Sequence, residues 1–134
     1  MPITRHDWPD RGALAEALAD RIAQVLAESL AGHGDAFLAV SGGATPARFL
    51  AALSKRHIDW ARVTITLVDE RWVEETSPRS NAALVKRHLL QGEAAAARFL
   101  PLYTPGATPE AGRLAAEERL RTAPKTLTVA VLGM

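Results

Sequence analysis

The stretch "AFLAVSGGATPARFL", residues 36–50, contains a short apolar run, two glycines and the start of an amphipathic segment. A continuous apolar run such as 36–40 is typical of a strand that is buried on both faces of a sheet. Thr45 followed by Pro46 indicates a helix start, because the hydroxyl can cap the first turn and proline fits the first helical position. These residues therefore predict a strand, a tight glycine turn and a helix in direct succession.

The regions on either side repeat this strand–helix pattern. Apolar residues at three- and four-residue spacing predict a helix over 10–30, with Asp10 at its start and Gly32 and Gly34 as candidates for its end. The remaining expected elements, in chain order, are a strand over 63–68, a helix over 81–90, a short strand or extended connection over 97–103, a helix that opens at Thr108-Pro109 and a strand over 127–133.

Apolar strands that alternate with helices predict an α/β fold: a doubly wound, mostly parallel sheet with helices on both faces. The chain of 134 residues is expected to form a single α/β domain, residues 1–134. It stops at Met134, directly after an apolar strand, whereas a central parallel strand should be followed by a crossover that covers it. We therefore expect an incomplete version of the full fold, the N-terminal portion of a longer domain.

Composition argues against several classes of protein. The formal net charge of +1 is not that of a dedicated nucleic-acid binder, and the absence of cysteine removes disulfides, thiolate nucleophiles and cysteine-ligated zinc. No apolar run approaches the roughly 20 residues of a membrane helix, and the acidic first twenty residues do not resemble a secretory signal. We expect a cytoplasmic protein without nucleic-acid or membrane partners, and no feature predicts its oligomeric state.

The histidines and tryptophans are scattered along the chain. Surface or helix-end positions are expected for the four histidines, which are His6, His33, His57 and His88. None of them forms a metal-ligand pair at helical spacing, so neither a metal site nor a cofactor is indicated. The core or its edge is expected for the three tryptophans, which are Trp8, Trp60 and Trp72.

Three segments follow predicted strands: residues 41–45, 69–71 and 133–134. Parallel strands place their carboxyl ends at one rim of a sheet, and open parallel sheets bind ligands beyond that rim. We therefore expect residues that are distant in the sequence to share one site.

The 41–45 segment is a candidate anion cradle. Gly42 and Gly43 let backbone N–H groups approach an anion, the next helix adds a partial positive charge, and Ser41 and Thr45 add hydroxyl donors. On these residues alone, an ordinary tight turn with Thr45 as the helix cap fits equally well. The segment has neither the Gly-Lys-Ser/Thr ending of a P-loop nor the spacing of a dinucleotide fingerprint, which favours a phosphorylated small molecule over a nucleotide.

The segment "LVDERWV", residues 67–73, places charges directly after a strand. Asp69 and Arg71 alternate with Glu70, so in an extended segment they point to the same side. Together they could orient a substrate or stabilise an oxyanion, or they could form a salt bridge that holds the loop.

The segment "SPRSNAAL", residues 77–84, opens the next helix. Ser80 or Asn81 is a candidate helix cap, and Arg79 could reach a phosphate if the loop folds back over the rim.

Taken in order, "SGGATP" (41–46), "DERWV" (69–73), "SPRSNAALV" (77–85) and "VAVLGM" (129–134) resemble the 6-phosphogluconolactonase family over nearly the whole chain. This resemblance implies hydrolysis of 6-phospho-D-glucono-1,5-lactone, a phosphorylated sugar lactone, in the oxidative pentose phosphate pathway. It also implies a doubly wound α/β fold related to that of the glucosamine-6-phosphate isomerases and deaminases.

The resemblance assigns roles to individual residues. Ser41, Gly42, Gly43 and Thr45 match the loop that holds the substrate phosphate. Asp69 matches the active-site aspartate, expected to orient substrate or water, and Arg71 matches the arginine expected to provide electrostatic or phosphate-side stabilisation. Ser80 and Asn81 match a Ser-Asn pair near the sugar, with Arg79 as a weaker candidate.

In this family the Leu-Gly-Met strand end runs on into a Gly-x-Asp-Gly-His segment whose histidine is the general base, and the present sequence ends before it. A positioned base typically supplies about 10²–10⁴-fold in rate. The full-length parent is therefore expected to be a lactonase, and the 134-residue chain alone to be severely impaired.

Two alternatives remain. Amino-sugar-phosphate isomerases and deaminases usually have Asp-Glu-Tyr where this chain has Asp69-Glu70-Arg71, so the arginine favours the lactonase. A non-catalytic sugar-phosphate-binding fragment is the other.

Overall fold

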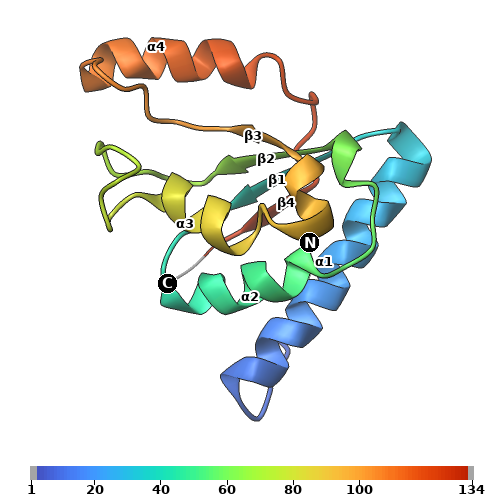
Figure 1. Ribbon diagram of the computed structural model, residues 1–134. Coiled ribbons are helices and arrows are strands. Elements are labelled where there is room, and N and C mark those ends of the chain that lie inside the picture. Colours follow the sequence, from blue (N-terminus) through green and yellow to red (C-terminus); the bar gives the residue numbers. More distant parts are fainter. Residues whose placement is uncertain (1–2, 133–134) are drawn as a thin grey trace.

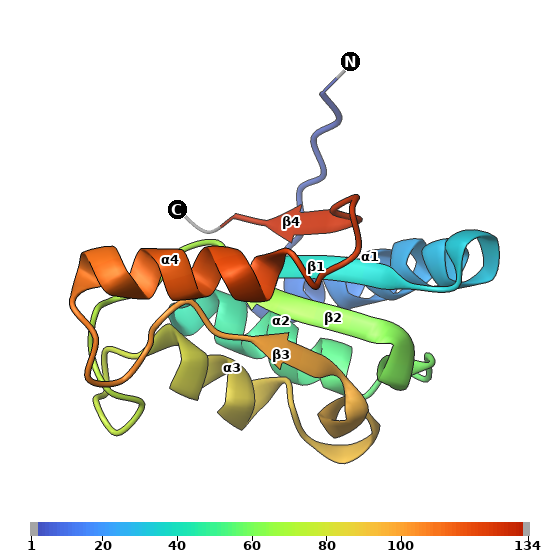
Figure 2. The same cartoon turned by 90° about the horizontal axis from the view of Figure 1, so that it is seen from above.

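The computed structural model describes residues 3–132, which form a four-stranded parallel sheet in the order β3-β2-β1-β4 (Figures 1 and 2). The strands are β1 (Ala36–Val40), β2 (Val63–Leu67), β3 (Arg98–Leu100) and β4 (Val129–Val131). The α-helices are α1 (Arg11–His33), α2 (Ala44–Ser54), α3 (Asn81–His88) and α4 (Pro109–Leu120). Short 3₁₀ helices span Trp60–Arg62 and Gly92–Ala96.

The strand order creates a switch point beside β1. The chain proceeds outward from β1 to β2 and β3, then returns to place β4 on the other side of β1. Val40 at the end of β1 is in register with Leu67 of β2 and Val131 of β4, so the three carboxyl ends lie at one rim. In doubly wound sheets, the crevice at such a switch point is the usual ligand site.

Helices lie on both faces of the sheet, as predicted. Figure 1 shows α4 on the opposite side of the sheet from α1 and α2. The main core lies on the side of α1, α2 and α3, where Leu26, Leu38, Leu53 and Trp60 are almost completely buried. Burying side chains of this size removes large apolar areas from water and is the main force that holds the layers together.

Most of the predicted helix ends match the structure. The Asp10 carboxylate accepts a hydrogen bond from the Ala13 N–H at 2.7 Å and so caps α1. Gly34 ends that helix with φ of 82°, in the left-handed region, whereas Gly32 lies inside it. Thr108 caps α4 through the Ala111 N–H, with proline at the first turn.

The expectation that Thr45 caps α2 is wrong. The helix begins at Ala44, one residue before Thr45, and Gly43 occupies the N-cap position with φ of 116°. Only glycine adopts such a backbone angle readily, so the chain turns into the helix before the threonine.

The tryptophans are divided between core and surface. Trp60 is buried, Trp72 is partly buried, and Trp8 is 45% exposed, which contradicts its expected place in or near the core. Trp8 lies in the segment before α1, where its ring stacks with that of His6.

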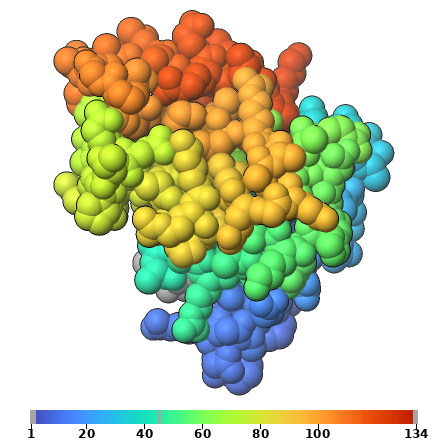
Figure 3. Space-filling model, viewed as in Figure 1, coloured from blue at the N-terminus to red at the C-terminus, as the bar shows by residue number. Residues whose placement is uncertain are grey.

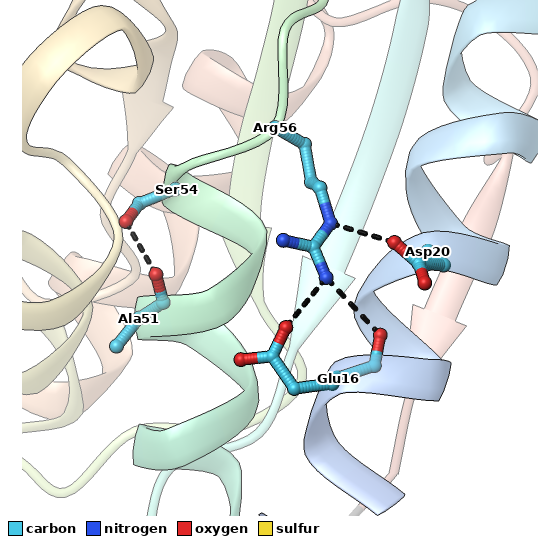
Figure 4. Close-up of polar contacts among 5 residues, drawn as sticks. All are labelled: Glu16, Asp20, Ala51, Ser54 and Arg56. Carbon is cyan, nitrogen blue, oxygen red and sulfur yellow. Dashed lines mark hydrogen bonds and ion pairs between the residues drawn. The ribbon is translucent and has the colours of Figure 1, made fainter. Parts of the chain in front are cut away.

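Arg56, which follows α2, fastens that helix to α1 (Figure 4). Its Nη2 donates to the Glu16 carboxylate at 2.8 Å and to the Glu16 carbonyl at 3.2 Å. Its Nε lies 2.9 Å from Asp20 Oδ1, an ion pair without the alignment of a hydrogen bond. The hydrogen bond to Glu16 is the main cause that raises the pKa of Arg56. Nearby, the Ser54 hydroxyl donates to the Ala51 carbonyl at 2.6 Å, within the last turn of α2.

Figure 3 shows the face formed by α3, the β3 region and α4, with the start of α1 projecting below it. No α-helix among residues 3–132 is both long enough and apolar enough to cross a membrane.

Candidate active site

A cleft of about 730 Å³ opens at the rim where β1 and β4 end. Its walls come from the 41–44 turn after β1, from Asp69 and Arg71 after β2, and from Asn81 at the start of α3. Val131 and Leu132 at the end of β4 close one side, and α1 contributes Leu14 and Leu18. The cleft therefore lies at the switch point of the sheet.

The floor of the cleft is the turn between β1 and α2. Ser41 is buried, and its N–H donates to the Val131 carbonyl at 3.1 Å, which ties the turn to β4. None of the side chains that the structure describes caps the first turn of α2. The free N–H groups of an uncapped first turn, together with the helix dipole, form an environment that favours an anion.

Asp69 and Arg71 both line the cleft, as their alternation predicts. Within the described part of the chain, no salt bridge joins them, so the simple loop-holding pair is not what the structure contains. The Arg71 guanidinium donates to the backbone carbonyl of Arg79 at 3.0 Å, which holds the two ends of the 71–79 loop together. A carboxylate and a guanidinium thus face the same space.

Glu70 points away from the cleft and toward the start of α3. Its Oε1 accepts from the N–H of Arg71 at 2.9 Å and of Asn81 at 2.7 Å, and its Oε2 accepts from the N–H of Ala82 at 2.9 Å. The Ser80 hydroxyl accepts from the Ala83 N–H at 3.1 Å.

The two helix starts at the rim therefore differ. The Leu84 N–H reaches the Ser80 carbonyl, so the first four N–H groups of α3 all have acceptors, while no described side chain caps α2. An anion would meet the Glu70 carboxylate at the first turn of α3, whereas no described carboxylate bonds the first N–H groups of α2. Of the two, α2 is the better anion site.

Asn81 joins the two loops that line the cleft. The side chain is buried, and its Nδ2 donates to the Asp69 carbonyl at 3.2 Å and to Asp69 Oδ1 at 3.4 Å. Its carboxamide also lies against Gly42, where any added Cβ would overlap it. Gly42 thus permits a close approach, which is a second reason for glycine in this turn.

Trp72 anchors the other side of the 69–79 loop to α4. Its indole N–H donates to the Ala107 carbonyl at 3.1 Å, and its ring fills the space beside Gly112. The ring also meets Tyr103 edge-on at 4.7 Å between centroids. Figure 3 shows the surface of this loop lying against that of α4.

Tyr103, which packs against Trp72, also bonds the 69–79 loop. Its hydroxyl donates to Glu74 Oε1 at 2.9 Å. This hydrogen bond, followed by partial burial and by the negative charge of Glu74, raises the pKa of Tyr103 above its ordinary value. The phenol therefore stays protonated and keeps its hydrogen bond.

The structure brings six of the predicted site residues to the cleft and leaves others apart. Those that line the cleft are Ser41, Gly42, Gly43, Asp69, Arg71 and Asn81. Ser80 is buried as a helix cap, and Arg79 meets Arg71 through its carbonyl, so neither lines the cleft. The backbone of Thr45 lies in the first turn of α2, while its side chain, like residues 133–134, lies outside what the structure describes.

The histidines lie away from the cleft, at the predicted surface and helix-end positions. His33 and His88 end α1 and α3, His57 pairs with Glu93 at the surface, and His6 is exposed. Among residues 3–132, no group of three or more His, Asp or Glu side chains could hold a metal ion.

Comparison with known proteins gives one family. The sequence model described as glucosamine-6-phosphate isomerases/6-phosphogluconolactonase matches residues 9–134. The 6-phosphogluconolactonase of Mesorhizobium japonicum is 52% identical over 95% of the chain and 53% of its own length. That of Rhizobium meliloti is 48% identical over 100% of the chain and 58% of its own length. The chain thus spans about half the length of the curated relatives it matches.

Solved structures agree with the fold. The crystal structure of a 6-phosphogluconolactonase from Shewanella baltica is 45% identical, with a TM-score of 0.92 over 95% of this chain and 55% of that one. A monomeric glucosamine-6-phosphate deaminase, 17% identical with a TM-score of 0.70, shares the fold.

Proposed function

Because the chain belongs to the glucosamine-6-phosphate isomerase/6-phosphogluconolactonase family, we propose that the protein carrying it is a 6-phosphogluconolactonase. It hydrolyses 6-phospho-D-glucono-1,5-lactone to 6-phosphogluconate, as a step of the pentose phosphate pathway in the cytoplasm. In this proposal, residues 1–134 are the N-terminal portion of a single lactonase-like domain.

One observation carries the proposal: a single cleft joins an uncapped helix start to a carboxylate and a guanidinium. The N–H groups of the 42–44 turn suit the 6-phosphate, with the hydroxyls of Ser41 and Thr45 as further donors. Asp69 and Arg71, which line the same cleft, are proposed to face the lactone ring.

Hydrolysis of a lactone requires water to attack the ester carbonyl and requires the negative charge on the carbonyl oxygen to be stabilised. In the proposal Arg71 provides that electrostatic stabilisation, and Asp69 orients the substrate or the attacking water. Asn81 contacts both Asp69 and Gly42, and so fixes the position of the 69–71 segment relative to the 42–44 turn. Ser80 contributes by capping α3, and Arg79 by receiving the Arg71 hydrogen bond.

The general base is proposed to be the histidine of the Gly-x-Asp-Gly-His segment that follows Leu-Gly-Met in the family pattern. Among residues 3–132, no histidine lines the cleft. A polypeptide limited to the 134 residues should therefore be slower than the full-length protein by about 10²–10⁴-fold. Turnover of the verified 134-residue polypeptide at the full-length rate would contradict this assignment.

The test of the function compares two reactions of the full-length protein. Acid release from the lactone, corrected for its spontaneous hydrolysis, is measured beside ammonia release from glucosamine 6-phosphate. The proposal expects lactone hydrolysis alone. Ammonia release without lactone hydrolysis would identify an isomerase/deaminase, and saturable 6-phosphogluconate binding without either reaction would identify a non-catalytic binder.

A further inference from the structure

We propose that Glu70 is a positioning residue for the reaction: its carboxylate joins the 69–71 segment to the first turn of α3 and thereby fixes Asn81 between Asp69 and Gly42. The inference rests on the proposed function, because the reaction it serves is lactone hydrolysis. Glu70 itself does not line the cleft.

The contacts of Glu70 reach two separate parts of the chain. One oxygen accepts from Arg71, the adjacent residue in the loop, and from Asn81, eleven residues away. The other oxygen accepts from Ala82. A single side chain therefore holds both ends of the 70–82 segment, and it does so with charge-assisted hydrogen bonds that gain from the positive end of α3.

Among residues 3–132, no other acceptor is recorded for these three N–H groups. Asn81 and Ala82 supply the first two N–H groups of α3, which no carbonyl within the helix can reach. Without the carboxylate, the loop would have to move or water would have to enter. The Ser80 hydroxyl still caps Ala83, so α3 itself should survive the loss of Glu70.

Movement of the 69–71 segment relative to the first turn of α3 would alter the cleft by displacing Asn81. The backbone of Asn81 is held by Glu70, while its side chain contacts Asp69 and lies against Gly42. The 41–43 turn is held separately, through the hydrogen bond from Ser41 to Val131. Loss of Glu70 should therefore disturb the Asp69–Arg71 side of the site more than the phosphate side, and so lower kcat more than it raises KM.

The chain offers a matched control. Glu75 lies in the same loop and also ties it to α3, through an ion pair with Lys86 at 2.7 Å, but this pair is exposed and away from the cleft. Glu75→Gln removes one loop-to-helix carboxylate without touching Asn81. It separates a loss of loop anchoring in general from the specific role of Glu70.

The experiment measures kcat and KM for the lactone in the full-length protein and its Glu70→Ala, Glu70→Gln and Glu75→Gln variants. Amide hydrogen exchange of Asn81 and Ala82 is followed in the same proteins. Glu70→Ala should lower kcat by about 10- to 100-fold, as expected for misplaced catalytic groups. KM should change by less than about 3-fold if phosphate binding is kept. Glu70→Gln keeps one acceptor oxygen, so its kcat should lie between those of the wild type and Glu70→Ala. The kcat of Glu75→Gln should match that of the wild type.

Equal kcat values for Glu70→Ala and Glu75→Gln would overturn the proposal, as would a loss confined to KM. Unchanged exchange of the Asn81 and Ala82 amides in Glu70→Ala would also overturn it. If the wild-type protein does not hydrolyse the lactone, the proposed function fails instead, and the exchange data still decide whether Glu70 holds Asn81.

Discussion

The side-chain amide of Asn81 occupies the space that any side chain at Gly42 would need. Gly42 lies in the turn after β1 and Asn81 is the first residue of α3, and both line the cleft. The sequence predicts Gly42 as a residue that exposes backbone N–H groups. The structure adds that the same glycine makes room for the residue that contacts Asp69.

Gly42→Ala should therefore impair the site while leaving the fold intact. The added methyl group must displace the Asn81 amide, and with it the contact to Asp69, so we expect lactone kcat/KM to fall by about 10- to 100-fold. Gly32→Ala is the control, because Gly32 lies inside α1 with open space around it. Unchanged kinetics in Gly42→Ala would show that the Gly42–Asn81 contact has no role in the reaction.

Gly112→Ala should destabilise the protein, although alanine normally stabilises a helix interior. A Cβ at Gly112 would overlap the Trp72 ring, and overpacking of this kind costs about 1–3 kcal/mol. Gly32→Ala should instead raise the free energy of unfolding by about 0.5–1 kcal/mol. Urea unfolding of the full-length variants measures both, and equal effects of the two substitutions would argue against the packing of Trp72 on α4.

Arg56→Ala should weaken the attachment of α2 to α1. The side chain bonds Glu16 and faces Asp20, but both carboxylates are largely exposed, so we expect a loss of about 1–2 kcal/mol in the free energy of unfolding. Arg121→Ala removes a largely exposed pair with Glu118 and should change stability by less than about 0.5 kcal/mol. Equal losses for the two variants would contradict the role assigned to Arg56.

Tyr103 should titrate above the ordinary value of 10.0. The Glu74 hydrogen bond needs a protonated phenol, so its contribution to stability is fully present below the unfolded pKa and is lost as pH rises through the higher folded pKa. The measurement is the phenolate absorbance that disappears in Tyr103→Phe. Glu74→Ala should lower this pKa toward 10.0, whereas Glu75→Ala should not; a wild-type pKa at or below 10.0 would contradict the contact.

Local patterns predict much of this fold because they reflect local physics. The apolar run at 36–40 is a strand, Asp10 and Thr108 cap their helices, and parallel strand ends bring the 41–43 turn to Asp69 and Arg71. Helix boundaries near glycine are less predictable, because the end of α1 at Gly34 and the start of α2 at Gly43 depend on positive backbone φ angles that neighbouring residues do not specify.

Contacts between distant segments could not be predicted in the same way. The Glu70 carboxylate caps a helix eleven residues later, and no local spacing signals such a cap. Trp72 against Gly112 joins a loop to a helix forty residues on, which depends on how α4 crosses the sheet. The alternation in 69–72 was the available signal: Asp69 and Arg71 face the cleft, so Glu70 and Trp72 must face structural partners.

The central claim is that the 42–44 turn, and not the start of α3, receives the phosphate of the substrate. The most direct measurement follows backbone amide NMR signals of the full-length protein while 6-phosphogluconate is added. If the phosphate binds at the 42–44 turn, the Gly42, Gly43 and Ala44 amides should show saturable shifts, with smaller shifts at Asn81 and Ala82, whose N–H groups already bond Glu70. Large shifts at Asn81 and Ala82 with none at Gly43 would contradict it.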